Sequence, residues 1–275
     1  KPLFTYFKQL FAQVTNPPID SIREELVMSL VGYIGAEGNL LCATAEQVHL
    51  LEIEQPILTN EELAKIKQIR EGSLRATTLP IVFEIESGVE RLKNALDLLC
   101  DNAGDAIAQG YNILVLSDRD VNERQAPIPS LLATAAVHHH LIRQGSRTRC
   151  GIVLETGDAR EIHHFCLLTG YGASAINPYL VFETYEDLHR QNQLKKDLPL
   201  AKAELNFIKA IDKGLLKVFA KMGISTLQSY RGAQIFEAVG LNTALVDRYF
   251  SGTPSRIEGI DLDVIYQEIK QRHIR

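Results

Sequence analysis

Hydrophobic positions follow a helical spacing near the start of the chain, with one interruption. The double proline at 17–18 removes amide donors and fixes an extended backbone, so it must separate two helices. The first is predicted over residues 1–13, and Asp20 and Ser21 are predicted to cap the second. The apolar positions of the two predicted helices are Leu3, Phe4, Phe7, Leu10 and Phe11, then Ile22, Leu26, Val27 and Leu30.

The pattern becomes irregular over residues 35–54 and then turns helical again. Thr59 or Asn60, followed by Glu61 and Glu62, is typical of a helix start, which predicts a helix over residues 60–70. Up to about this point the chain reads as a mainly helical segment.

From residue 78 onward, short β-rich runs alternate with helical patterns. The predicted strands cover residues 79–85, 112–118, 151–155 and 174–176, with a very short apolar step at 224. The predicted helices cover residues 89–109, part of 127–145, 159–170, a segment containing Tyr179, Phe182 and Tyr185, 200–222, the stretch after 225, 244–250 and 262–272.

This alternation predicts right-handed crossovers and a sheet or barrel with helices outside. About five strands are too few for an eight-fold barrel. The predicted fold is therefore α/β: an incomplete or degenerate (β/α) barrel-like domain with parallel strands, plus N-terminal and C-terminal helices.

Composition excludes several classes of protein. The net charge of -5 and the pI near 5.9 argue against a nucleic-acid or basic membrane surface. No apolar run approaches the roughly 20 residues that span a bilayer. The four cysteines at 42, 100, 150 and 166 are scattered, which favours reduced thiols and a cytoplasmic setting. The chain starts without Met, which suggests a processed or excised piece or a missing beginning.

Polar residues gather just after the predicted strands. They are Ser117, Asp118, Arg119 and Asp120, then Glu155, Thr156 and Asp158, then Asn177, then Ser225 and Thr226. Active sites of barrels and open α/β sheets are built on that rim, but short βα loops also need polar capping residues. One candidate function is therefore a free-standing (β/α) enzyme or phosphate-binding module with its site at Asp118, Glu155, Asn177 and Ser225.

The histidines at 138–140 and 163–164 do not predict a metal site. Consecutive helical residues point about 100° apart, so adjacent imidazoles cannot converge on one ion. Structural or hydrogen-bonded histidines are favoured. Gly170 and Gly172 follow a helix and are interpreted as its C-terminal cap. No catalytic, cofactor-binding or metal-binding residues are predicted.

The stretch 221–236 is a junction between two predicted helices. Gly223 can take the left-handed conformation that ends a helix. The hydroxyls of Ser225, Thr226 and Ser229 then precede a new helix, where any of them could cap it or leave its amides free for a ligand such as phosphate.

Several long stretches, in order, resemble the central domain of glutamate synthase, and together they cover nearly the whole chain. They are 6–20, 23–30, 51–52 with 55–58, 110–119, 126–133 with 137–141, 176–179, and 221–236. The resemblance implies one central, linking domain over residues 1–275, with 1–72 mainly helical and 78–275 the β/α part. It also implies a degenerate relative of the family's flavin barrel, in which 221–236 is a closing strand and helix without a cofactor.

Glutamate synthase makes two glutamates from glutamine and 2-oxoglutarate. In the family, a glutaminase domain releases ammonia, which travels inside the protein to a domain that uses FMN, a 3Fe-4S cluster and electrons from ferredoxin or a nicotinamide-dependent subunit. The resemblance implies that this chain holds none of these cofactors and is not catalytic alone. It implies a scaffold that joins the glutaminase and FMN domains and helps wall the ammonia tunnel.

Four uncharged residues are the tunnel candidates that the resemblance suggests: Met28, Ser29, Thr59 and Asn60. Uncharged donors and acceptors suit neutral ammonia, because a buried charge would trap or protonate it. The alternative is that Met28 and Ser29 are ordinary core residues. The sequence of residues 228–231 resembles that of the ferredoxin-dependent glutamate synthases. Surfaces covered by neighbouring domains should leave apolar patches, which predicts self-association of the isolated chain.

Overall fold

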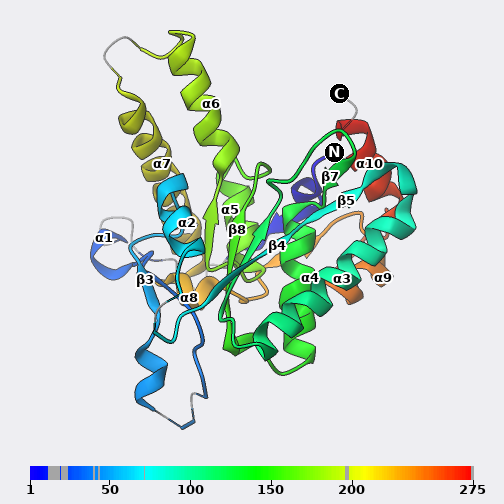
Figure 1. Ribbon diagram of the computed structural model, residues 1–275, viewed down its shortest axis with the longest axis horizontal. Coiled ribbons are helices and arrows are strands. Elements are labelled where there is room, and N and C mark those ends of the chain that lie inside the picture. The colour runs from blue at the N-terminus through cyan, green and yellow to red at the C-terminus, as the bar shows by residue number, and fades with distance from the viewer. Residues whose placement is uncertain are drawn as a thin grey trace.

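The centre of the molecule is a parallel β-sheet with helices on both of its faces (Figure 1). The computed structural model describes residues 1–11, 19, 24–39, 41–42, 44–70, 72–195 and 198–273. Within those residues, no helix is long and apolar enough to cross a membrane.

Four strands form the sheet in the order β4 (Ala76–Pro80), β6 (Ile113–Ser117), β8 (Gly151–Glu155) and β9 (Ala175–Asn177). All three neighbouring pairs are parallel. Every residue of β6, β8 and β9 is buried, as expected for strands covered on both faces. A single parallel bridge from Ile57 to Ile176 continues the pairing beyond β9. The predicted parallel, incomplete (β/α) fold is confirmed.

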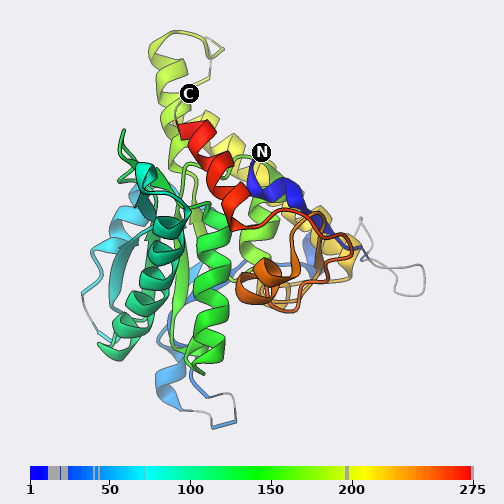
Figure 2. The ribbon, with the colours of Figure 1, turned by 90° about the vertical axis from the view of Figure 1, so that its right-hand side faces the viewer.

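Three helices pack on one face of the sheet: α3 (Val89–Ala108), α4 (Ser130–Arg143) and α5 (Ile162–Gly170). Their apolar side chains share one large core with the strand residues that point to this face, such as Leu116 and Leu154. Figure 2 shows α3 and α4 side by side in front of the sheet. This layer is the outer layer of a (β/α) unit.

The opposite face of the sheet is closed by α2 (Asn60–Lys67). Leu63 and Ile66 of α2 form a second, smaller core with strand residues that include Val115 and Val153. In a closed barrel this face would line the interior, which other strands would complete. Here a helix of the same chain fills the space, which explains why so few strands suffice.

Two further helices form an antiparallel pair that projects beyond the sheet in Figure 1, α6 (Tyr179–Arg190) and α7 (Leu200–Met222). The end of α7 is as predicted: Gly223 adopts a φ of 70°, in the left-handed region. The helices predicted over residues 60–70, 89–109, 127–145, 159–170, around Tyr179, over 244–250 and over 262–272 are confirmed as α2, α3, α4, α5, α6, α9 (Thr243–Tyr249) and α10 (Leu262–His273).

The prediction of a helix over residues 1–13 is wrong. The chain forms a 3₁₀ turn, η1 (Leu3–Tyr6), and then a strand, β1 (Phe7–Gln9), antiparallel to β10 (Phe236–Ala238). The partner strand lies far away in the sequence, so no local pattern could reveal the pairing. The two ends of the chain also meet, because the Tyr6 hydroxyl donates to Glu268 of α10 at 2.9 Å. Figure 2 shows η1 beside α10.

Three other predictions need correction. The second predicted helix ends earlier than expected, because its described part, α1 (Glu24–Val27), stops before Leu30, and Leu26 in it is 85% exposed. Its predicted caps Asp20 and Ser21 lie outside the described residues. Residues 35–54 are not wholly irregular: β3 (Leu51–Ile53) pairs with β2 (Gly32–Ile34), and the 3₁₀ turn η2 (Ala45–Val48) lies between them.

The strand predicted over 79–85 is two strands, because β5 (Val82–Glu84) leaves β4 to pair with β7 (Gln125–Pro127). Two more 3₁₀ turns, η3 (Ile85–Ser87) and η4 (Arg147–Arg149), and the short helix α8 (Leu227–Tyr230) complete the described elements.

Candidate functional site

Polar residues occupy the carboxyl ends of β6, β8 and β9, as the sequence predicted. Ser117, Glu155 and Asn177 are the last residues of these strands and lie in one register across the sheet. Asp118 and Thr156 follow directly. All five are buried. Such a rim is where α/β proteins place ligands, so it is the candidate site.

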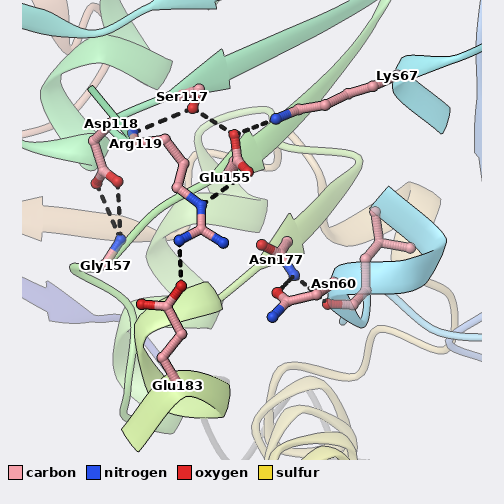
Figure 3. Close-up of polar contacts among 10 residues, drawn as sticks. Asn60, Lys67, Ser117, Asp118, Arg119, Glu155, Gly157, Asn177 and Glu183 are labelled. Atoms are coloured by element: carbon pink, nitrogen blue, oxygen red, sulfur yellow. Dashed lines mark hydrogen bonds and ion pairs between the residues drawn. The ribbon is translucent and has the colours of Figure 1, made fainter. Parts of the chain in front are cut away.

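Glu155 is the centre of the first cluster on this rim. Its carboxylate accepts hydrogen bonds from Lys67 Nζ and from Ser117 Oγ, both at 2.5 Å, and from Arg119 Nε at 3.4 Å. The Glu155 side chain is only 6% exposed, so a charge there requires compensation. Figure 3 shows Lys67, Ser117 and Arg119 converging on this carboxylate.

The same cluster extends outward through Arg119. Its guanidinium forms an ion pair with Glu183 of α6 and lies 4.2 Å from the ring centroid of Tyr179. Two cations, Lys67 and Arg119, therefore face two carboxylates, Glu155 and Glu183. The cluster is internally balanced, and its groups bind one another.

Asp118 points away from this cluster, toward Gly157 (Figure 3). Its carboxylate accepts from the Thr156 hydroxyl at 2.7 Å and from the Gly157 amide at 3.1 Å. Burial raises the pKa of Asp118 to about 6, and the hydrogen bonds only partly oppose this. A cavity of about 360 Å³ adjoins it, lined also by Asp158 and Arg160.

Asp158 is a structural residue by its contacts. Its Oδ2 accepts from the backbone amide of Ser130, the first residue of α4, at 3.3 Å. A carboxylate there satisfies a free helix amide and complements the helix dipole. The capping interpretation of this rim residue is the one that its geometry favours.

Asn177 connects the rim to α2. Its side-chain amide donates to Leu58 O at 2.9 Å and to Asn60 Oδ1 at 3.0 Å. Since Lys67 lies at the other end of α2, this one helix contacts the rim at both Asn177 and Glu155. Sequence reasoning missed Lys67, because nothing in the spacing of a helix-ending lysine indicates a partner 88 positions later.

The four residues predicted to line a tunnel lie on two segments. Thr59 caps α2 in a capping box with Glu62, and Asn60 holds the contact to Asn177 just described. Ser29 forms a parallel bridge with Thr226, and its amide donates to Ser225 O at 2.9 Å. Met28 packs against the large core. All four side chains are partly exposed.

The predicted helix after residue 225 is a single turn, α8 (Leu227–Tyr230). Thr226 caps it, as expected, by accepting from the Ser229 amide at 3.3 Å. The Leu227 amide donates to Ser29 O at 3.2 Å. These amides already have partners inside the chain, so of the two alternatives they fit capping and not a phosphate cradle.

The side chains of α8 and the residue after it join three other segments. Tyr230 Oη donates to Gln9 of β1 at 2.6 Å, and Gln228 donates to Glu37 at 2.6 Å. Arg231 forms an ion pair with Glu37 at 2.5 Å and donates to Ser174 at 2.6 Å. We call this set the α8 junction. It fastens the segment before β9, the N-terminal strand and the loop after β2 to one another.

The histidine at 138 has the structural role that was predicted for it. Its Nδ1 accepts from Arg147 Nε at 2.9 Å, and burial, aided by Arg147, lowers the pKa of His138 to about 2. Among the described residues there is no group of three His, Cys, Asp or Glu side chains that could hold a metal ion. All four cysteines are free, and three of them are buried.

Comparison with known proteins gives a consistent set of matches. The family described as "Glutamate synthase central domain" matches residues 1–242. The large chain of a glutamate synthase [NADPH] from Bacillus subtilis (strain 168) is 49% identical over 98% of this chain and 17% of its own length. A glutamate synthase [NADH] from Schizosaccharomyces pombe is 46% identical over 99% of this chain and 13% of its own length.

A ferredoxin-dependent glutamate synthase 2 from Synechocystis sp. is 42% identical over 98% of this chain and 18% of its own length. The chain therefore spans less than a fifth of the length of these curated relatives, which include forms named for three different electron donors.

Proposed function

Because the chain belongs to the glutamate synthase central domain family, we propose that residues 1–275 are the non-catalytic scaffold of a longer glutamate synthase polypeptide. In that polypeptide the chain joins a glutaminase domain to an FMN and 2-oxoglutarate domain and helps to form the ammonia tunnel. Its role then belongs to glutamate biosynthesis, in the cytoplasm.

One observation carries the non-catalytic part of this proposal: the strand rim is occupied by the chain itself. Lys67 and Asn60 of α2 reach Glu155 and Asn177, where a ligand of a (β/α) domain would bind. Displacing them would leave a buried carboxylate with fewer partners, which is costly. The alternative of a phosphate-binding module is weakened further, because the Leu227 and Ser229 amides already donate hydrogen bonds to Ser29 O and Thr226 Oγ1.

We propose that the cofactors of the longer protein lie outside this chain. A 3Fe-4S cluster is held by cysteine thiolates, and the cysteines here form no ligand group. For FMN, the α8 amides and the rim side chains described above already have partners. We propose that FMN, the cluster and the contact with ferredoxin or a nicotinamide-dependent subunit belong to the rest of the polypeptide.

We propose Met28, Ser29, Thr59 and Asn60 as this chain's contribution to the tunnel wall. None of the four carries a charge, and all are partly exposed at the surface of the isolated chain. The bond from Asn177 to Asn60 Oδ1 holds that amide in one orientation. A neutral, fixed wall allows neutral ammonia to pass without being protonated or trapped.

Two experiments test the proposal. FMN added to the isolated chain should cause no thermal stabilisation and no bound flavin absorbance, whereas tight binding would overturn the scaffold function.

In the full-length enzyme, Met28→Ala should increase the ammonia released per glutamate formed. The matched control is Leu98→Ala, which removes an exposed apolar side chain on α3, a helix that packs on the opposite face of the sheet from α2. An equal amount of ammonia released per glutamate formed in the two variants would refute the tunnel assignment.

A further inference from the structure

The strand β3 has an outer edge with no strand partner in the described part of the chain. It pairs only with β2, in a two-stranded antiparallel sheet. The other side of β2 lies against the central sheet, where Ile34 packs so close to Gly151 that a Cβ there would be 2.5 Å from its side chain. In an antiparallel pair, alternate residues direct N–H and C=O away from the partner, so β3 presents unpaired backbone groups outward.

A groove runs along this edge, between β3 and α2. Its cavity has a volume of about 380 Å³. The lining residues are the consecutive run Leu51–Gln55 together with Leu58, Glu62, Lys65, Ile66 and Ile69. A run of consecutive strand residues along a cavity indicates the edge of the strand rather than one of its faces, since the side chains of a face alternate. We call this the β3–α2 groove. In Figure 1, β3 lies just below α2.

The groove is apolar inside and acidic at its border. Five of its ten lining residues are aliphatic, and three are glutamates: 52, 54 and 62. The one lysine, Lys65, is paired with Glu61 at 2.8 Å. The border therefore carries a net negative charge, which complements a partner with lysine or arginine side chains.

We propose that the β3–α2 groove receives an extended segment from another part of the longer polypeptide, which adds to β3 as a strand. This segment carries apolar residues that enter the groove, alternating with lysine or arginine residues that meet the glutamates. The inference rests on the proposed function, since it requires a longer polypeptide around this chain. Strand addition to an exposed edge gains main-chain hydrogen bonds, while pockets for alternate side chains give specificity.

A second copy of the chain is the less suitable occupant. Pairing two β3 edges would place Glu52 and Glu54 of one copy against the same glutamates of the other. Like charges directly opposite each other destabilise a strand pair. A basic segment turns the same two glutamates into favourable partners.

The test uses the natural full-length polypeptide without substitutions. Hydrogen exchange of the amides of residues 51–54 should be at least about tenfold slower than in a charge-reversed variant, Glu52→Lys with Glu54→Lys. Zero-length carbodiimide cross-linking of the unaltered protein should join Glu52 or Glu54 to a lysine outside residues 1–275. The matched control is Asp101→Lys with Asp105→Lys, which makes the same charge change on exposed positions of α3 and should leave the exchange unchanged.

Fast exchange of residues 51–54 in the unaltered protein would overturn the inference, and so would cross-links that lead only to residues 51–69 of a second copy. Both measurements on the unaltered protein remain decisive if the charge-reversed variant fails to fold. Failure here is separable from failure of the proposed function. Coupled glutamate synthesis together with an unprotected β3 edge would reject the groove partner and leave the scaffold role standing.

Discussion

Removing the ammonium group of Lys67 should destabilise the chain more than removing the charge of its partner Glu155. In Lys67→Met, the carboxylate of Glu155 stays buried and loses a 2.5 Å charged hydrogen bond. In Glu155→Gln, the amine of Lys67 is already 30% exposed and can turn toward water. The asymmetry follows from burial, because an uncompensated charge is costly only where water cannot reach it.

The structure sets the size of the effect. A hydrogen bond between charged groups contributes about 1.5–3 kcal/mol, and loss of one partner of a fully buried pair costs about 3–5 kcal/mol. Glu155 keeps Ser117 at 2.5 Å and Arg119 at 3.4 Å, and Lys67 is partly screened by solvent. We therefore expect Lys67→Met to lower the free energy of unfolding by about 2 kcal/mol and Glu155→Gln by about 1 kcal/mol.

Urea unfolding of the two single variants and the double variant measures these values and their coupling. Glu61→Gln is a suitable control, because its pair with Lys65 is exposed on both sides and screened by solvent, so its loss should leave the free energy of unfolding nearly unchanged. If Lys67→Met proved no less stable than Glu155→Gln, or if the coupling free energy were near zero, the assignment of Lys67 as the counter-ion of the rim would be refuted.

Three further outcomes are expected. In the folded state the pKa of Asp118 is raised from 3.8 to about 6, so protonation of Asp118 favours folding. The stabilisation from this protonation is fully present below pH 3.8 and is lost as the pH rises through 6. Relative to Asp118→Asn, the unfolding free energy should fall by about 3 kcal/mol over that window, and an unchanged difference would contradict the burial argument. Gly172→Ala places a Cβ 2.2 Å from His138 Nδ1 at a φ of 112°, so it should lower the melting temperature strongly. The control Gly72→Ala has a φ of 64° but meets open space, so its melting temperature should fall much less. Equal shifts in the two variants would count against this packing. The isolated chain exposes Leu26, Leu41 and Val48, and sedimentation should show self-association that Leu41→Ser weakens, whereas a monomer at all concentrations would remove the prediction.

The strands β6 and β8 and the helices α3 and α7 could be predicted because their signals are local. A continuous apolar run indicates a strand covered on both faces, and Gly223 marks the end of α7 where the left-handed conformation is required. The pair β1–β10 could not be predicted in this way. Phe7 has the spacing of a helical residue, but its strand pairs with Ala238 at the far end of the chain.

The candidate site was predictable in part: its residues could be assigned to the ends of the strands, but what lies against them could not. Residues that end parallel strands must share one rim, so Ser117, Glu155 and Asn177 could be placed on the same edge of the sheet, while their adjacency depends on the strand order that the structure shows. Whether that rim faces a ligand or a helix depends on where α2 lies. Its position is fixed by packing of Leu63 and Ile66 against the sheet, which is a tertiary property that an amphipathic pattern leaves open.

The stretch 221–236 links the family assignment to the physical role of the chain. By its residue types it resembled a phosphate cradle, with a glycine helix end followed by hydroxyls. In the structure its groups bind other segments: Tyr230 reaches β1, Arg231 reaches Glu37 and Ser174, and the Gly232 amide donates to Gly170 O at 3.0 Å. The Arg231 side chain is only 12% exposed, so its ion pair with Glu37 is largely shielded from solvent. A segment whose polar groups hold distant parts of one chain together has the physical property that the proposed scaffold requires, because it would keep the surfaces that meet the two proposed neighbouring domains in a fixed relation.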